Sequence, residues 1–206
     1  MSRPTAAPAP APTTARGRAR RRAVVDAAAE LFDAVGFHAT SMDDVGAAAG
    51  ISGPGLYRHV ASKDDLLIAV FDRLWDRLRP AVEHAATLQP RAAIEALAAA
   101  HADMVVDDPA ALRLLLRELR SVPDDYQRLA ARNHRRWIDA WAAPLATLRP
   151  DLDAGRVRTL VLAAHGALDA VATHAEAQQL PVSGADVPAE QRSALAAAAL
   201  RVLDLP

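Results

Sequence analysis

Residues 50–63 carry several hydrogen-bonding side chains around a short segment that has a helix-capping serine near each end. Tyr57 and His59 can donate hydrogen bonds, and Lys63 supplies a positive charge. Lys63 is the only lysine in a chain with 23 arginines, so background composition does not explain it. Helix N-termini attract phosphate through unpaired N–H groups and the helix dipole. The pattern therefore indicates contact with the phosphate backbone of DNA.

A cluster of arginines precedes this segment and makes the N-terminal part basic. Residues 1–63 hold eight basic and five acidic residues, a net charge of +3, whereas residues 64–206 hold 16 and 20, a net charge of −4. The Pro- and Ala-rich residues 1–17 predict a disordered arm. We expect the arginines to add sequence-independent attraction to DNA or to reach a minor groove: Arg16, Arg18, Arg20, Arg21 and Arg22.

Apolar residues at helical spacing, separated by glycine, proline and capping residues, predict an all-α protein of about nine helices. Gly36 and Gly50 end the first two helices, Thr40 or Ser41 caps the second and Ser52 caps the third. The N-terminal helices form a helix-turn-helix unit over residues 18–65, and residues 66–206 form a larger helical body. The predicted helices cover residues 23–35, a short segment ending at 49, a segment from 53 to no further than 60, then 63 to about 80, 91–106, 110–121, 124–148, 154–179 and 188–203.

Composition and motifs argue against enzymes, metal sites and membrane spans. The chain has no cysteine, no metal-ligand or phosphate-loop motif and no nucleophile elbow, so we expect no catalytic residue, metal or cofactor. The Asp107-Asp108 pair flanks a proline and indicates helix capping rather than acid–base chemistry. No apolar run is long enough to cross a membrane. We expect a cytoplasmic protein.

Further residues around the capped segment form a specific pattern: Leu31-Phe32, Gly36-Phe37, Thr40, Val45, Ala49 to Ser52, Leu56 to His59 and Ser62 to Leu67. In order and spacing, these residues resemble the N-terminal domain of the TetR family of transcriptional regulators. The resemblance covers about residues 20–70. It implies an N-terminal DNA-binding domain followed by a helical ligand-binding and dimerisation domain.

The resemblance implies roles for individual residues. Thr40 and Lys63 match phosphate-binding positions, and Tyr57 and His59 match a pair that contacts the DNA backbone. Ser52, Gly53 and Pro54 occupy the leading end of the recognition helix, which faces the major groove. The chain departs from the family pattern in the stretch from Gly53 to Gly55, which has few side chains to read bases, and in Val60, where phenylalanine is usual. We therefore expect Ser52, Pro54 and Tyr57 to touch bases, with DNA shape and the arginines supplying the rest.

The body carries candidate ligand and partner surfaces. Its ligand candidates mix apolar lining with a few polar groups: His101, Met104, Leu115, Arg117, Trp137, Trp141, His165 and Asp169. An apolar seam at spacings of three and four fits either helix–helix association or intramolecular core, and the family resemblance favours dimerisation. The seam residues are Val157, Val161, Ala164, Leu168 and Val171, with Leu195, Leu200 and Leu203 in the last helix.

Together these features predict a homodimeric regulator that binds a palindromic operator in double-stranded DNA. In this hypothesis it is a repressor that is released by a small hydrophobic or amphipathic effector. The alternative is a helical scaffold or adaptor whose basic arm binds polyanions nonspecifically.

Overall fold

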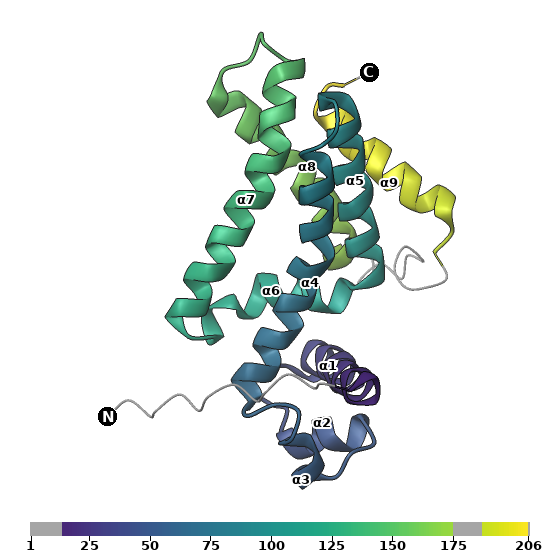
Figure 1. The fold of residues 1–206 in the computed structure, drawn as a ribbon, viewed down its shortest axis with the longest axis vertical. Helices are drawn as coiled ribbons and strands as arrows, with labels where there is room; N and C mark the ends of the chain where they lie inside the picture. Colours follow the sequence, from purple (N-terminus) through teal and green to yellow (C-terminus); the bar gives the residue numbers. More distant parts are fainter. Residues whose placement is uncertain (1–13, 175–186, 206) are drawn as a thin grey trace.

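The computed structural model describes residues 14–174 and 187–205. Within these residues the secondary structure is entirely helical, as the sequence predicts. The chain forms a small unit of α1, α2 and α3 at one end and a body of the remaining helices at the other, with α4 extending from one into the other (Figure 1). The elements are α1 (Ala15–Val35), α2 (Met42–Ala48), α3 (Gly53–Leu56), α4 (Lys63–Ala85), α5 (Pro90–Asp107), α6 (Pro109–Glu118), the 3-10 turn η1 (Leu119–Ser121), α7 (Asp124–Leu148), α8 (Ala154–His174) and α9 (Ala189–Val202).

The N-terminal unit has a compact apolar core that packs on the first turns of α4. Phe32 from α1 meets Phe37 edge-to-face, with ring centroids 5.2 Å apart. Leu56, the last residue of α3, is completely buried although α3 is only four residues long. Burial of this side chain, rather than helix propensity, therefore holds the short helix in place.

The helices of this unit begin and end at capping and turn residues of the types that the sequence indicates. Ser41, and not Thr40, is the N-cap of α2, and it forms a reciprocal capping box with Asp44. Ser62 caps α4 by accepting a hydrogen bond from the backbone N–H of Asp65 at 3.0 Å. Gly50 adopts a φ of +63°, which the turn between α2 and α3 requires and which favours glycine.

One prediction about this unit is wrong, and another is confirmed in position only. α1 begins at Ala15 with Thr14 as its N-cap, so the arginines at 16–22 lie on a helix rather than on an extended arm. The helix forms because arginine and alanine are good helix formers and the following turns are anchored by burial. Residues 1–13 of the predicted arm lie outside the described residues. Ser52 occupies the N-cap position of α3, but its side chain makes no capping hydrogen bond.

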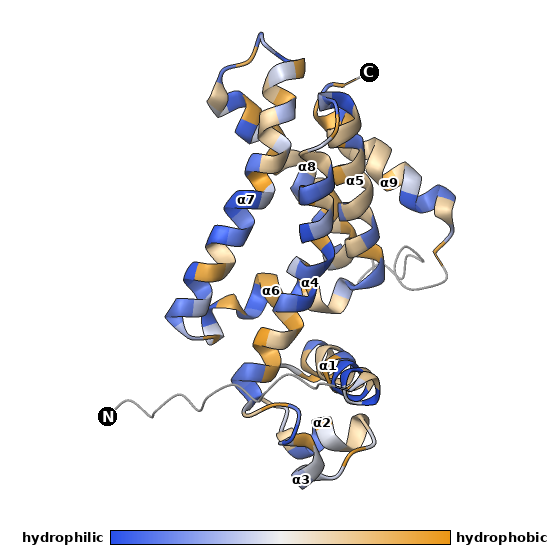
Figure 2. Ribbon diagram, viewed as in Figure 1, coloured by the Kyte–Doolittle hydropathy of each residue, from blue (hydrophilic) through white to orange (hydrophobic). Residues whose placement is uncertain are grey.

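The body is organised around α5, which packs against α4, α7, α8 and α9. Hydrophobic colours cover most of α5, whereas α7 alternates between hydrophobic and hydrophilic residues (Figure 2). Ile94 and Leu97 of α5 and Trp141 of α7 are completely buried. A helix that is apolar on most sides suits a central position. In the described part of the chain, no helix is long and apolar enough to cross a membrane.

The predicted dimer seam is largely wrong, because most of it lies inside one protomer. Val157, Val161, Ala164 and Leu168 on α8, together with Leu203, are at most 2% exposed in the single chain. These residues face the central helices of the body, where α8 packs on α5, α6, α7 and α9. Periodicity alone identifies an apolar face but not what covers it. Val171, Leu195 and Leu200 are only partly buried.

Candidate nucleic-acid interface and effector cavity

The turn between α2 and α3, together with α3 itself, forms an exposed edge of the N-terminal unit. Ser52, Pro54 and Arg58 are exposed there, and Tyr57 is 54% exposed. Several of the predicted base-contacting side chains therefore lie on the surface. Arg58 is an additional exposed cation that the predicted set of contacts omitted, although its position beside Tyr57 in the sequence is a signal for it.

The two glycines of α3 differ in whether the space around them excludes a larger residue. A Cβ atom at Gly55 would lie 2.7 Å from Cγ2 of Ile51, so this position needs glycine for packing. A Cβ atom at Gly53 would meet only Oδ1 of Asp43 at 3.4 Å, an ordinary contact distance. Space therefore explains the small residue at 55 but not the one at 53.

The two predicted phosphate-binding residues also stabilise the connection between α1 and α2. The buried Thr40 hydroxyl donates to the carbonyl oxygen of Gly36 at 2.9 Å. Lys63 Nζ donates to the carbonyl oxygens of Thr40 at 2.6 Å and His38 at 3.3 Å, and it lies 4.6 Å from the centre of the Phe37 ring. The Thr40 hydroxyl proton is thus engaged inside the protein, while Lys63 joins the start of α4 to this connection.

Arg20 and Arg21 attach α1 to the two sides of α3. Arg20 Nη2 donates to the carbonyl oxygen of Gly50 at 2.8 Å, and Arg21 Nε donates to that of His59 at 3.3 Å. His59 is partly buried, and its Nδ1 has no hydrogen-bond partner in the described protein. The two arginines place positive charge beside the exposed edge of α3 while holding it in position.

A largely apolar cavity of about 150 Å³ lies in the body. Six of the eight predicted ligand residues line it: His101, Met104, Leu115, Trp137, His165 and Asp169. Trp141 is not part of the wall, because it is completely buried behind the rings of His101 and His165. Arg117 is also absent, because its guanidinium is directed to Asp33 and to the carbonyl oxygen of Phe32. The prediction that these two residues line the cavity is wrong.

Further wall residues come from helices whose apolar faces the sequence shows but cannot orient. They are Phe71, Leu74, Trp75 and Leu78 from α4, Leu112 and Leu116 from α6, and Tyr126, Ala130, Asn133 and His134 from α7.

A cluster of aromatic and imidazole rings forms the polar part of this region. His101 Nε2 lies 2.9 Å from Oδ1 of Asp169. The His165 ring lies 4.9 Å from that of His101 and 4.7 Å from that of Trp141, centre to centre. Burial, together with repulsion from His101 and His134, lowers the pKa of His165 to about 2. His165 is therefore neutral at physiological pH.

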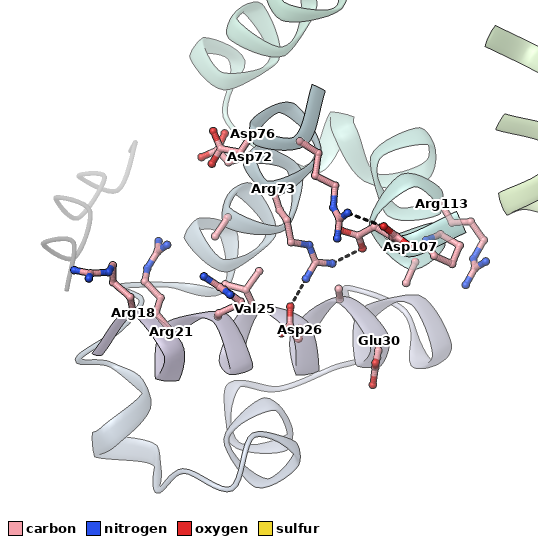
Figure 3. A pocket seen from close by; sticks show the side chains of 17 residues that line it. Arg18, Arg21, Val25, Asp26, Glu30, Asp72, Arg73, Asp76, Asp107 and Arg113 are labelled. Carbon is pink, nitrogen blue, oxygen red and sulfur yellow. Dashed lines mark hydrogen bonds and ion pairs between the residues drawn. The ribbon is translucent and has the colours of Figure 1, made fainter. Parts of the chain in front are cut away.

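A separate, open and charged groove of about 1240 Å³ runs between α1, α4 and the start of α6. Figure 3 shows Arg73 reaching from α4 to Asp26 on α1. The guanidinium of Arg73 lies 2.5 Å from Asp26 and 2.5 Å from Asp108. Burial raises the pKa of Asp108, and the charge of Arg73 opposes that rise. The side chain of Asp108 makes no capping hydrogen bond, so the sequence-based assignment of this residue as a cap misses its ion pair.

Two arginines of α6 make a second attachment to α1. Arg113 Nε donates to Oδ2 of Asp33 at 2.8 Å, and Arg117 Nη2 lies 3.4 Å from the other carboxylate oxygen. The Asp33 side chain is only 9% exposed. The body therefore holds α1 through ion pairs on both α4 and α6, an arrangement that no local motif indicates because the partners are far apart in the sequence.

Comparisons with known proteins agree with this architecture. The model of the family described as bacterial regulatory proteins, tetR family, matches residues 24–70. The transcriptional repressor KstR2 of Mycobacterium tuberculosis is 32% identical over 146 residues, 65% of this chain and 72% of that protein. The transcriptional activator FasR of Mycolicibacterium smegmatis is 37% identical over 98 residues, 47% of this chain but only 45% of FasR.

A solved structure extends the similarity over most of the fold. The complex of AibR with isovaleryl coenzyme A and operator DNA superposes with a TM-score of 0.67 at 18% identity, covering 90% of this chain and 97% of that one. The N-terminal helix-turn-helix, the all-helical body and the extent of the match to KstR2 lead to one conclusion. The chain belongs to the TetR family of transcriptional regulators, DNA-binding proteins that are not enzymes.

Proposed function

We propose that this protein is a homodimeric repressor that leaves a palindromic operator when a small hydrophobic or amphipathic effector enters the body cavity. The observation that carries the proposal is that α4 and α6 both line the cavity and both hold α1 by ion pairs. A change in the cavity wall is thus transmitted to the DNA-binding unit through the same two helices.

On each of the two helices, one residue lines the cavity and its neighbour in the sequence binds α1. On α4, Leu74 lines the cavity and the preceding residue, Arg73, binds Asp26. On α6, Leu112 lines the cavity and the next residue, Arg113, binds Asp33. An effector shifts DNA affinity only by its differential affinity for the two conformations. Displacement of either helix changes the position of α1, and with it that of α3, in each half of a dimer.

The exposed surface of α8 supports the dimer part of the proposal. Leu162 on α8 is 52% exposed, and it lies outside the face of this helix that is buried in the protomer. Gly166, one turn further on, has open space around it, so a second helix can approach closely. Two-fold association through this face would present two copies of α3 to successive major grooves, roughly 34–36 Å apart.

The sense of regulation and the effector class rest on the relatives. KstR2 is named a repressor and FasR an activator. The AibR complex contains a coenzyme A thioester, which combines an apolar acyl group with a polar carrier. Acyl-coenzyme A thioesters are therefore the first effectors to test, alongside native mass spectrometry of the purified protein for a co-purifying small molecule.

Selection of bound sequences from random double-stranded DNA, followed by footprinting, tests the DNA-binding part. We expect enrichment of a palindrome and protection of two half-sites about one helical turn apart. Equal, salt-sensitive binding to every DNA and to heparin would instead support the polyanion-binding adaptor.

Sedimentation of the Leu162→Arg variant tests the dimer. The added charge should convert a micromolar dimer to a monomer and weaken operator binding. Leu129→Arg on α7, at an exposed leucine outside the proposed interface, is the matched control and should remain dimeric. A wild-type protein that is monomeric at micromolar concentration contradicts the dimer.

A further inference from the structure

Two buried polar atoms without hydrogen-bond partners belong to neighbouring residues of the cavity wall. They are Nδ1 of His101 and Nε2 of His165, two of the seven such side-chain atoms in the described residues. The two residues are at most 5% exposed, and the centres of their rings lie 4.9 Å apart. Buried polar atoms normally have partners, so a cluster of unpaired ones indicates a group that is meant to bind there.

The charges around these atoms discriminate between kinds of ligand group. Asp169 lines the cavity, so it opposes a second carboxylate. His165 is neutral and offers one N–H donor and one acceptor. The cluster therefore favours an oxygen that accepts a hydrogen bond and brings no negative charge.

The apolar wall sets the size of the group that carries this oxygen. Leu74, Leu78, Met104 and Leu115 are among the wall residues. The cavity volume of about 150 Å³ is close to that of an engineered apolar cavity that binds benzene. A single ring or a short branched chain therefore fills the space.

We propose that the His101–His165 cluster binds an uncharged carbonyl or hydroxyl group on a small hydrocarbon body, and that it discriminates against a free carboxylate. This inference rests on the proposed function, in which the cavity is the effector site, and it names the class of the effector. The esterified or ketone form of a small acid or alcohol fits the site, and the free acid does not.

Three probes of nearly equal size carry a neutral carbonyl group, a carboxylate and no oxygen, respectively: acetophenone, benzoate and ethylbenzene. Binding to the full-length protein at pH 7 is measured by quenching of tryptophan fluorescence and by NMR titration. We expect acetophenone to bind at least about tenfold more tightly than either of the others, which corresponds to one hydrogen bond of about 1.4 kcal/mol. Equal or tighter binding of benzoate overturns the proposal, as does the absence of binding of all three probes.

The His165→Phe variant tests whether the cluster causes the selectivity. It keeps an aromatic ring and removes the polar atoms, so acetophenone should lose about tenfold in affinity while ethylbenzene keeps its own. His174→Phe on the exposed end of the same helix is the matched control and should leave all affinities unchanged.

Helical circular dichroism and thermal unfolding verify that each variant folds, and the comparison of probes on the wild-type protein does not depend on any variant. An unchanged ratio of acetophenone to ethylbenzene affinity in folded His165→Phe overturns the role of the cluster. Footprints on the selected operator, run on the same preparations, separate this failure from failure of the proposed function. A normal footprint without probe selectivity rejects only the effector class.

Discussion

The DNA-binding unit and the body satisfy their polar side chains in different ways. In the DNA-binding unit, Asp44 and Ser41 pair across three residues, and Lys63 joins its own helix to the nearby connection at Thr40. Lys63, Arg20 and Arg21 all donate to backbone carbonyl oxygens of the same small unit, over 23, 30 and 38 positions. In the body, His101 pairs with Asp169 across 68 positions. The interior of the body instead brings together side chains from distant helices, and Nδ1 of His101 and Nε2 of His165 have no hydrogen-bond partner in the described residues.

Removal of a large core side chain from each region gives the largest expected effects. Trp141→Ala in the body and Phe32→Ala in the DNA-binding unit should each lower the free energy of unfolding by about 3–5 kcal/mol. Urea denaturation followed by circular dichroism and tryptophan fluorescence measures this. If the regions unfold as one unit, both variants shift a single transition. Trp75→Ala, at a partly buried tryptophan, should cost clearly less.

Loss of an ion pair between the two regions should have the next largest effect on the free energy of unfolding. Asp33→Asn keeps the shape of a buried side chain and removes the charge that faces Arg113 and Arg117. The free energy of unfolding should fall by roughly 2–3 kcal/mol, because two arginines lose their counter-charge. Asp76→Asn, in an exposed pair with Arg79, should change it by less than about 0.5 kcal/mol in the same urea titration. Equal effects of the two variants would show that the regions are held together by apolar contacts alone.

The pH dependence of stability should separate the body from the DNA-binding unit. The pKa of His165 falls from 6.5 to about 2 on folding. Below about pH 6.5 this imidazole therefore takes up a proton in the unfolded chain but not in the folded one. The stability gained from neutral His165 is thus complete above pH 6.5 and is lost as the pH falls. Between pH 6.5 and 5 the loss should reach roughly 2 kcal/mol relative to His165→Phe. Parallel urea titrations of the two proteins at several pH values measure it, and identical pH profiles would contradict a buried neutral imidazole.

The smallest expected change in stability separates the contacts that Lys63 makes within the protein from its predicted phosphate contact. Lys63→Met keeps an apolar stem near Phe37 and removes the hydrogen bonds to the carbonyl oxygens of Thr40 and His38, so stability should fall by about 1 kcal/mol. Arg58→Met, at an exposed position, should leave stability unchanged. Both variants should weaken operator binding, and removal of one phosphate-binding cation should reduce the salt slope by about one. Unchanged stability in Lys63→Met would assign this residue to DNA alone.

The parts of the site that could be predicted are those that depend on neighbours in sequence. Ser62 and Gly50 act as the residue types indicate, because a cap and a left-handed turn need only a few adjacent residues. Six of the eight candidate ligand residues lie in the cavity wall, since polar groups within apolar helical faces are visible in the sequence. Trp141 and Arg117 were misplaced because both lie on helices that turn them away from the cavity, and helix rotation is set by packing.

Periodicity and capping act over a few residues, so the amino-acid sequence alone was enough to specify the helix-turn-helix, its caps and the all-helical class. Three features emerged only from the packed fold: the seam from Val157 to Leu168 is core, the arginines at 16–22 lie on a helix, and Asp33 joins the two regions. These outcomes depend on which faces meet across the fold, and burial of apolar surface is non-directional. The pattern along one helix therefore leaves the partner of each face open until all the helices are packed.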